Sequence, residues 1–322
     1  MAADGDVERQ FRRFRRISRW IGWWPRRLAV WFGKLRTRWV IATGDFDQVR
    51  GILRANLEPV LPPGEDPGPV VESLLRKYGL FLTDYFRIPS MRADRFRPLF
   101  RPLKGQEHVQ AALQKGKGAI LVTPHLGNWE LGGIAMRLMG MPVTVVAVPD
   151  NVNPGVTRYR DWARSVHGIR VLNIGPGLMT PLELARALEE NHLVAMLADR
   201  NFFEADPVEV EFFGRKAWFP RGPALLALAT GAPILPAFVT LGEGDKYDAE
   251  VCAPVPVPEE GTKPERAAAA IRSLARLFEE RIRSHPDQWF IFDPFWSGAE
   301  PLSNTAREAA GLAGGGSVSP LQ

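Results

Sequence analysis

The sequence predicts an α/β protein in which a mostly parallel mixed sheet is flanked by helices. Three short apolar runs, 119–122, 143–148 and 193–198, have the length and composition of buried strands. Upstream of the first run, 46–57 and 70–86 each carry apolar residues at helical spacing. These two segments predict an N-terminal helical layer added to the sheet.

The remaining elements follow from periodicity and from proline- and glycine-rich breaks. A linker at 61–69 separates the first two predicted helices. Further helices are expected at 156–166, 181–190, 223–230 and 264–284, and further strands at 170–174, 209–213, 232–240, 246–251 and 288–292. The strands at 232–240 and 246–251 are expected to pair across 242–245, and 288–292 is expected to be an edge strand.

Composition limits the function classes. The 322 residues carry a formal net charge of +5, which favours anionic partners such as lipid, an acidic carrier protein or nucleic acid. The single cysteine, Cys252, rules out a disulfide within the chain and fits a reducing compartment. None of the five histidines stands at zinc-ligand spacing, so we expect neither a metal site nor a bound cofactor.

Residues 1–45 form a basic segment rich in arginine and tryptophan. Phe14, Ile17, Ile21 and Trp24 repeat at helical spacing, and no apolar stretch approaches the roughly 20 residues of a transmembrane helix. Such a segment is typical of an amphipathic helix in a membrane interface. A basic helix packed on the core and an RNA-binding arm remain alternatives. Residues 46–298 would form the main domain, and the Gly/Ala/Ser/Pro-rich residues 299–322 a disordered tail.

The chemistry is expected where the first strand ends. His125 lies in a strand-to-helix loop, Asn128 is a good helix N-cap, and Glu130 falls in the first turn of the following helix. A histidine can take a proton from a hydroxyl, and a carboxylate on its other nitrogen fixes the tautomer. We therefore expect His125 to be a general base oriented by Glu130, with backbone N–H groups, helped by Asn128, stabilising an oxyanion. A loop histidine beside a capping acid is the alternative.

Four segments in this order resemble the bacterial lipid A biosynthesis (lauroyl/myristoyl) acyltransferases, a branch of the lysophospholipid-acyltransferase-like superfamily. The segments are HLGNWE at 125–130, LADRN at 197–201, the block 212–236 and PDQWFIF at 286–292. The resemblance extends over about residues 46–298 and is shared with phosphatidylinositol mannoside acyltransferases. It implies an acyltransferase fold and transfer of a fatty acyl chain from acyl-carrier protein or acyl-CoA to a glycolipid hydroxyl, lipid A type.

The resemblance also suggests supporting residues. Asp199, at the end of a strand, would support His125 or contact substrate, which makes it the rival of Glu130. Arg200 beside it is a further supporting or substrate-binding candidate; the alternative is an ion pair between Asp199 and Arg200. Arg164 and Arg221 would bind an anionic group, against the alternative of surface arginines.

The resemblance places the protein at the cytoplasmic face of a bacterial inner membrane, as a peripheral or monotopic protein. Two other classes remain open. A non-catalytic peripheral membrane-binding protein would keep the basic helix without needing His125. A nucleic-acid binder would use the arginines, but the sequence carries no recognition motif for one, so no nucleic-acid partner is expected.

Overall fold

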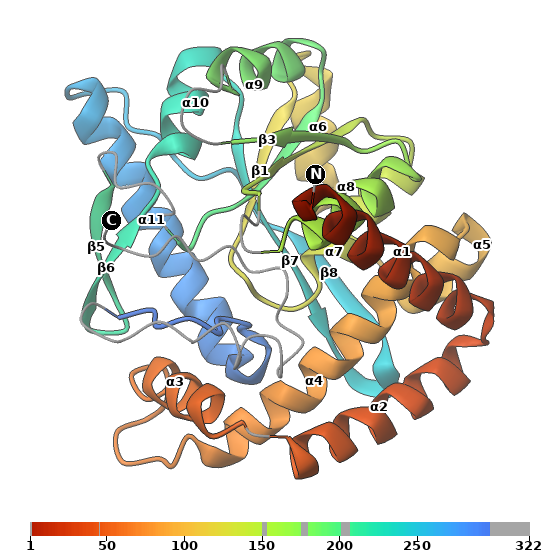
Figure 1. Cartoon of the computed structure of the whole chain (residues 1–322). Helices are drawn as coiled ribbons and strands as arrows, with labels where there is room; N and C mark the ends of the chain where they lie inside the picture. Colours follow the sequence, from red (N-terminus) through yellow and green to blue (C-terminus); the bar gives the residue numbers. More distant parts are fainter. Residues whose placement is uncertain (1, 45, 150–152, 175–179, 201–206, 297–322) are drawn as a thin grey trace.

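A six-stranded sheet forms the centre of the protein (Figure 1). The computed structural model describes residues 2–44, 46–149, 153–174, 180–200 and 207–296. The strands lie in the order β3-β2-β4-β1-β7-β8, with β7 and β8 antiparallel and the other pairs parallel. Their bounds are β1 Ala119–Thr123, β2 Val143–Ala147, β3 Arg170–Asn173, β4 Leu193–Leu197, β7 Ile234–Leu241 and β8 Tyr247–Val251. The predicted mostly parallel mixed sheet is confirmed.

Helices cover both faces of this sheet and divide the core in two. One core joins the sheet to α9 (Thr180–Glu189), α10 (Gly222–Thr230) and α11 (Lys263–Ser284). The other joins it to α6 (Gln106–Gln114), α7 (Trp129–Leu138) and α8 (Pro154–Ser165). Strand β1 feeds both, because Ile120 and Val122 point into the first core while Ala119 and Leu121 point into the second.

The N-terminal region adds a layer of four helices, as expected. They are α1 (Ala2–Trp23), α2 (Arg26–Thr43), α3 (Asp47–Leu57) and α4 (Gly68–Arg87), and Figure 1 shows α1 and α2 joined at a sharp turn. Both helices contact α4, and α1 also contacts α8. Phe14 stacks on Phe86, and Ile21 is buried. The regular apolar stripe of α1 therefore packs on protein, while a different set of aromatic side chains is exposed.

Most predicted elements downstream are confirmed, including the pairing of β7 with β8. A hairpin of β5 (Val208–Phe212) and β6 (Arg215–Phe219) forms a separate two-stranded sheet beside α11. The prediction of an edge strand at 288–292 is wrong, because the structure has no strand there. The backbone there makes a 3-10 turn, Pro286–Gln288, and the side chain of Gln288 bonds both the N–H and the C=O of Leu241. A side chain, rather than a backbone ladder, thus attaches this segment to β7. The tail expected at 299–322 lies outside the described residues.

The loop between β1 and α7 is fixed to β7 at Gly127. Its φ is +64°, and a Cβ atom there would lie 2.0 Å from the carbonyl oxygen of Val239. The close approach lets the N–H of Asn128 donate to that oxygen at 2.7 Å, while the N–H of Gly127 donates to Gln288. Only glycine satisfies both the left-handed backbone and the missing space.

We predict that Gly127→Ala lowers the free energy of unfolding by more than about 2 kcal/mol, since strain at positive φ adds to a backbone clash. Gly133→Ala is the matched control: it lies within α7, and the nearest atom to its added Cβ is 3.9 Å away. This control should be neutral or stabilising by up to about 1 kcal/mol. Chemical denaturation measures both, and equal effects would contradict the role given to Gly127.

Candidate active site

His125 and Asp199 meet at one edge of the sheet, where two neighbouring strands end. Strands β1 and β4 pair in parallel with Thr123 opposite Leu197, so the residues that follow each strand emerge together. The Nδ1 atom of His125 lies 2.7 Å from Oδ1 of Asp199. The histidine side chain is 15% exposed and the aspartate 0%. This arrangement is a histidine with a buried carboxylate behind it, at the carboxyl end of a parallel sheet.

Asp199 accepts two further hydrogen bonds. The backbone N–H of His125 donates to Oδ2 at 2.9 Å, and Nε1 of Trp289 donates to the same oxygen at 3.0 Å. Burial alone would raise the pKa of Asp199, but the charge of His125 and these hydrogen bonds hold that pKa below its ordinary value. Asp199 is therefore ionised at neutral pH and can only accept, so Nδ1 of His125 carries the proton between them.

Glu130, expected to orient His125, has another partner. Both of its carboxylate oxygens accept hydrogen bonds from Arg164 on α8, at 2.6 and 3.0 Å. The side chains of Glu130 and Arg164 are each 8% exposed, which makes them a buried bidentate ion pair. The expected pairing of Glu130 with His125 is thus corrected in favour of Asp199. The physical reason is that Arg164 on α8 reaches Glu130 and supplies a cation that the spacing of the motif does not reveal.

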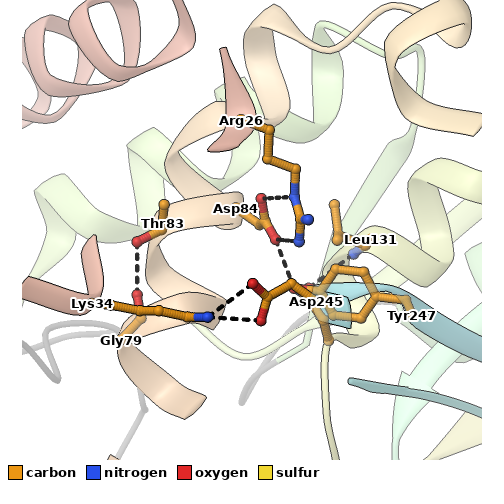
Figure 2. Close-up of polar contacts among 9 residues, drawn as sticks. Arg26, Lys34, Gly79, Thr83, Asp84, Leu131, Asp245 and Tyr247 are labelled. Carbon is orange, nitrogen blue, oxygen red and sulfur yellow. Dashed lines mark hydrogen bonds and ion pairs between the residues drawn. The ribbon is translucent and has the colours of Figure 1, made fainter. Parts of the chain in front are cut away.

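Asn128 caps α7 as expected, because its Oδ1 accepts from the N–H of Leu131. Its other amide atom, Nδ2, donates to the hydroxyl oxygen of Tyr247 at 3.3 Å. Tyr247 donates in turn to the buried carboxylate of Asp84, which also receives two hydrogen bonds from Arg26 (Figure 2). Both amide atoms of Asn128 make hydrogen bonds that hold the loop, and Nδ2 has a second N–H to donate. Its expected help in stabilising an oxyanion stays a prediction.

The backbone N–H groups of the loop are also mostly engaged. Those of His125, Leu126, Gly127 and Asn128 donate to Asp199, Pro124, Gln288 and Val239. In the first turn of α7, the N–H groups of Leu131 and Gly132 donate to Asn128, which leaves those of Trp129 and Glu130 without a partner within the helix. An oxyanion stabilised by backbone donors from this motif would therefore lie at the start of α7.

The other expected site residues lie at different places. Arg200 donates to Asp293 at 3.0 Å and so ties the end of β4 to the C-terminal segment; it does not pair with Asp199. Arg221 immediately precedes α10 and is half-buried. Arg164 is expected to bind an anionic group, and the group that it binds in the structure is the side chain of Glu130.

Sequence analysis missed three residues around the loop. Trp289 binds Asp199, and Tyr247 and Asp84 support Asn128. A signal existed for Asp84, an acid within an otherwise apolar helical stripe. None existed for Tyr247, whose position in β8 is typical of any core tyrosine.

Among the described residues, no group of three or more histidine, cysteine, aspartate and glutamate side chains could hold a metal ion. No described helix combines the length and apolar character needed to cross a bilayer.

Comparison with known proteins identifies relatives. The family model described as bacterial lipid A biosynthesis acyltransferase matches residues 17–297. The chain is 35% identical, over 76% of each sequence, to a phosphatidylinositol mannoside acyltransferase of Mycobacterium tuberculosis. It is 31% identical to the protein of that name in Mycolicibacterium smegmatis, over 76% of this chain and 78% of the relative. A lipid A biosynthesis acyltransferase of Haemophilus influenzae is 28% identical over 58% of this chain and 55% of its own length.

We predict that Glu130→Gln destabilises the fold by about 3 kcal/mol, because the buried charge of Arg164 loses its bidentate partner and keeps only Asp161, 4.0 Å away. Replacing both partners, as Glu130→Leu with Arg164→Met, should recover most of that loss, since no buried charge then remains. Denaturant titration of the two variants and wild type measures this. A double variant no more stable than Glu130→Gln would contradict the ion-pair account.

The depressed pKa of Asp199 predicts a stability difference that depends on pH. Ionised Asp199 contributes stability that is present above its unfolded pKa, about 4, and is lost as pH falls through the lower folded value. Wild type should therefore lose more unfolding free energy than Asp199→Asn on acidification below about pH 4. Urea titrations at a series of pH values compare the two, and parallel profiles would contradict this role.

Proposed function

Because the chain belongs to the bacterial lipid A biosynthesis acyltransferase family, we propose that it moves a fatty acyl chain from a thioester donor to a hydroxyl group of a membrane glycolipid. The observation that carries the mechanism is the hydrogen bond between His125 and the buried carboxylate of Asp199. A scaffold that only binds membranes has no need for a buried, ionised carboxylate behind a histidine.

In the proposed reaction, Nε2 of His125 takes the proton from the acceptor hydroxyl. Asp199 holds the opposite nitrogen protonated and stabilises the imidazolium that forms. The hydroxyl oxygen attacks the thioester carbonyl and forms a tetrahedral oxyanion. First-turn N–H groups of α7 are suited to stabilise that charge. Collapse of the intermediate forms the ester, and the thiolate leaves with the proton held by His125.

The surroundings of His125 support this role. Trp129 packs edge-on against the imidazole, with ring centroids 5.3 Å apart, and Phe81 packs on Trp129. The ring is therefore held by an aromatic wall on one side and by Asp199 behind it. A fixed base reduces the reorganisation that proton transfer would otherwise require.

We propose a phosphatidylinositol mannoside, in preference to a lipid A precursor, as the acceptor. The relatives named for the mannoside match more of this chain, at higher identity, than the relative named for lipid A. Acyl-carrier protein and acyl-CoA both remain possible donors, and the net charge of +5 is complementary to an acidic carrier.

We also propose that the protein works at the cytoplasmic face of the inner membrane, with residues 1–45 in the interface. Large apolar side chains on α1 and α2 are exposed beside arginines: Trp20, Trp23, Leu28, Trp31, Leu35 and Trp39. Tryptophan beside arginine on one surface is the composition of interfacial helices.

We predict that His125→Ala and Asp199→Asn each lower acyl transfer by about 10²–10⁴-fold, because proton transfer loses its base or the correct tautomer. The assay offers labelled acyl-CoA and acyl-carrier protein with phosphatidylinositol mannosides or a lipid A precursor. His108→Ala is the control, since His108 lies on α6 outside the site, and it should keep wild-type turnover.

Two outcomes would count against the mechanism. If folded His125→Ala keeps wild-type turnover, another residue is the base. A burst of released thiol before any acyl transfer would indicate an acyl-enzyme in place of direct attack. If folded wild type binds lipid but no donor is turned over, a non-catalytic membrane-binding protein becomes the better reading.

A further inference from the structure

A cavity lies at the turn between α1 and α2, and its lining residues are ones that the proposed reaction does not use. Its volume is about 1020 Å³. The wall is formed by the α1–α2 turn, the end of α4 with the segment to Leu99, and the β7–β8 connection at 244–246. None of His125, Glu130 and Asp199 lines this cavity. We call it the turn cavity.

Positive charge dominates the turn cavity. Six cationic side chains line it, against two acidic ones, Asp94 and Asp245. The cations are Arg26, Arg27, Lys34, Arg87, Arg95 and Lys246. Arg26 is neutralised by Asp84, and Lys34 by Asp245. The guanidinium groups of Arg27 and Arg95 are exposed and form no ion pair with a described residue, so the cavity holds uncompensated positive charge.

Arg87 is the buried cation among the residues that line the turn cavity. Only 6% of it is exposed, and its Nη1 donates to the carbonyl oxygens of Ile21 and Trp24, which holds the turn. Its Nε is buried and has no hydrogen-bond partner among the described residues. Burial lowers the pKa of Arg87; the charge of Asp84 opposes this shift, and the charges of Arg26 and Arg95 add to it. A buried donor without an acceptor, beside like charges, would be stabilised by an anion.

The start of α2 adds further positive potential to the turn cavity. The N-cap position is Pro25, no side chain caps the helix, and its first turn contains no acid. Pro25, Arg26 and Arg27 all line the cavity. The free N–H groups and the positive end of the helix dipole therefore belong to the same wall as the arginines.

The rim of the turn cavity is apolar and exposed. Trp23 and Trp31 line it with 86% and 63% of their surfaces exposed. Cationic groups within and tryptophan at the edge match the two parts of a membrane phospholipid, a phosphate and the start of its acyl chains. A free anion would have no use for the aromatic rim.

We propose that the turn cavity binds the phosphate of an anionic membrane glycerophospholipid, with Arg27, Arg95 and Arg87 as its ligands. The bound phosphate would lie outside the catalytic site, because none of His125, Glu130 and Asp199 lines the cavity. This inference goes beyond the proposed function and does not rest on it, because lipid binding needs neither His125 nor a thioester.

Isothermal titration with dihexanoyl phosphatidylglycerol below its micelle concentration tests the site without a membrane surface. We expect saturable binding of one lipid per chain. Arg27→Gln/Arg95→Gln should weaken it by about tenfold or more, since it removes two charged donors. The matched control, Arg36→Gln/Arg38→Gln, removes the same charge from α2 outside the cavity and should change affinity by less than about threefold.

Vesicles of phosphatidylcholine with and without phosphatidylglycerol provide the second arm, and inorganic phosphate the third. Co-sedimentation should depend on phosphatidylglycerol and fall more for the cavity variant than for the control. Equal losses in the two variants would show diffuse surface attraction and overturn the proposal. Inorganic phosphate that binds as tightly as the short lipid would assign the cavity to a free anion instead.

Separate control experiments test whether the variants fold and whether lipid binding is independent of catalysis. Thermal unfolding of both double variants should match wild type, because all four arginines substituted are exposed. His125→Ala should bind the lipid as wild type does, so a failure of acyl transfer and a failure of lipid binding would be distinguished.

Discussion

The site depends on one buried carboxylate. Asp199, which follows β4, accepts hydrogen bonds from the ring and the backbone of His125, in the loop after β1, and from the indole of Trp289 in the C-terminal segment. An ionised carboxylate with no exposure is costly unless its lone pairs are filled. Three donors occupy most of these acceptor sites, so the same bonds that make the charge tolerable also fix the imidazole. Stability and orientation of the base therefore have one physical origin.

Two further sets of buried polar contacts fix the elements around Asp199. Glu130 and Arg164 join the start of α7 to α8, and Asp84 joins the start of α2 to Tyr247 and thereby to Asn128. Burial and Asp84 both raise the pKa of Tyr247 well above its ordinary value, so its hydroxyl stays protonated and remains a donor. The loop that carries His125 is thus held from the sheet side, the helix side and the N-terminal layer.

The fold could be predicted from the sequence more completely than the site. Apolar runs such as 119–122 and 193–198 reveal strands because burial on both faces leaves a local record in composition. The position of His125 in a strand-to-helix loop and the cap at Asn128 are also local features. The partner of His125 is not, because Glu130 and Asp199 both suit it chemically and only the parallel register of β1 and β4 decides between them. The prediction of a strand at 288–292 failed for a related reason: its apolar, aromatic composition fits a strand, but Gln288 binds β7 through its side chain.

Trp289 also has a consequence for the order in which the protein can become active. It stands 90 residues after Asp199, and Asp199 stands 74 after His125. During synthesis, α1–α4 emerge before His125, whereas Trp289, the donor that completes the environment of Asp199, emerges only after α11. Contacts so distant in sequence form late, after the loops between them have been closed. A nascent chain can therefore present its tryptophan- and arginine-rich surface long before it holds an assembled base, and activity has to wait until synthesis has passed Trp289.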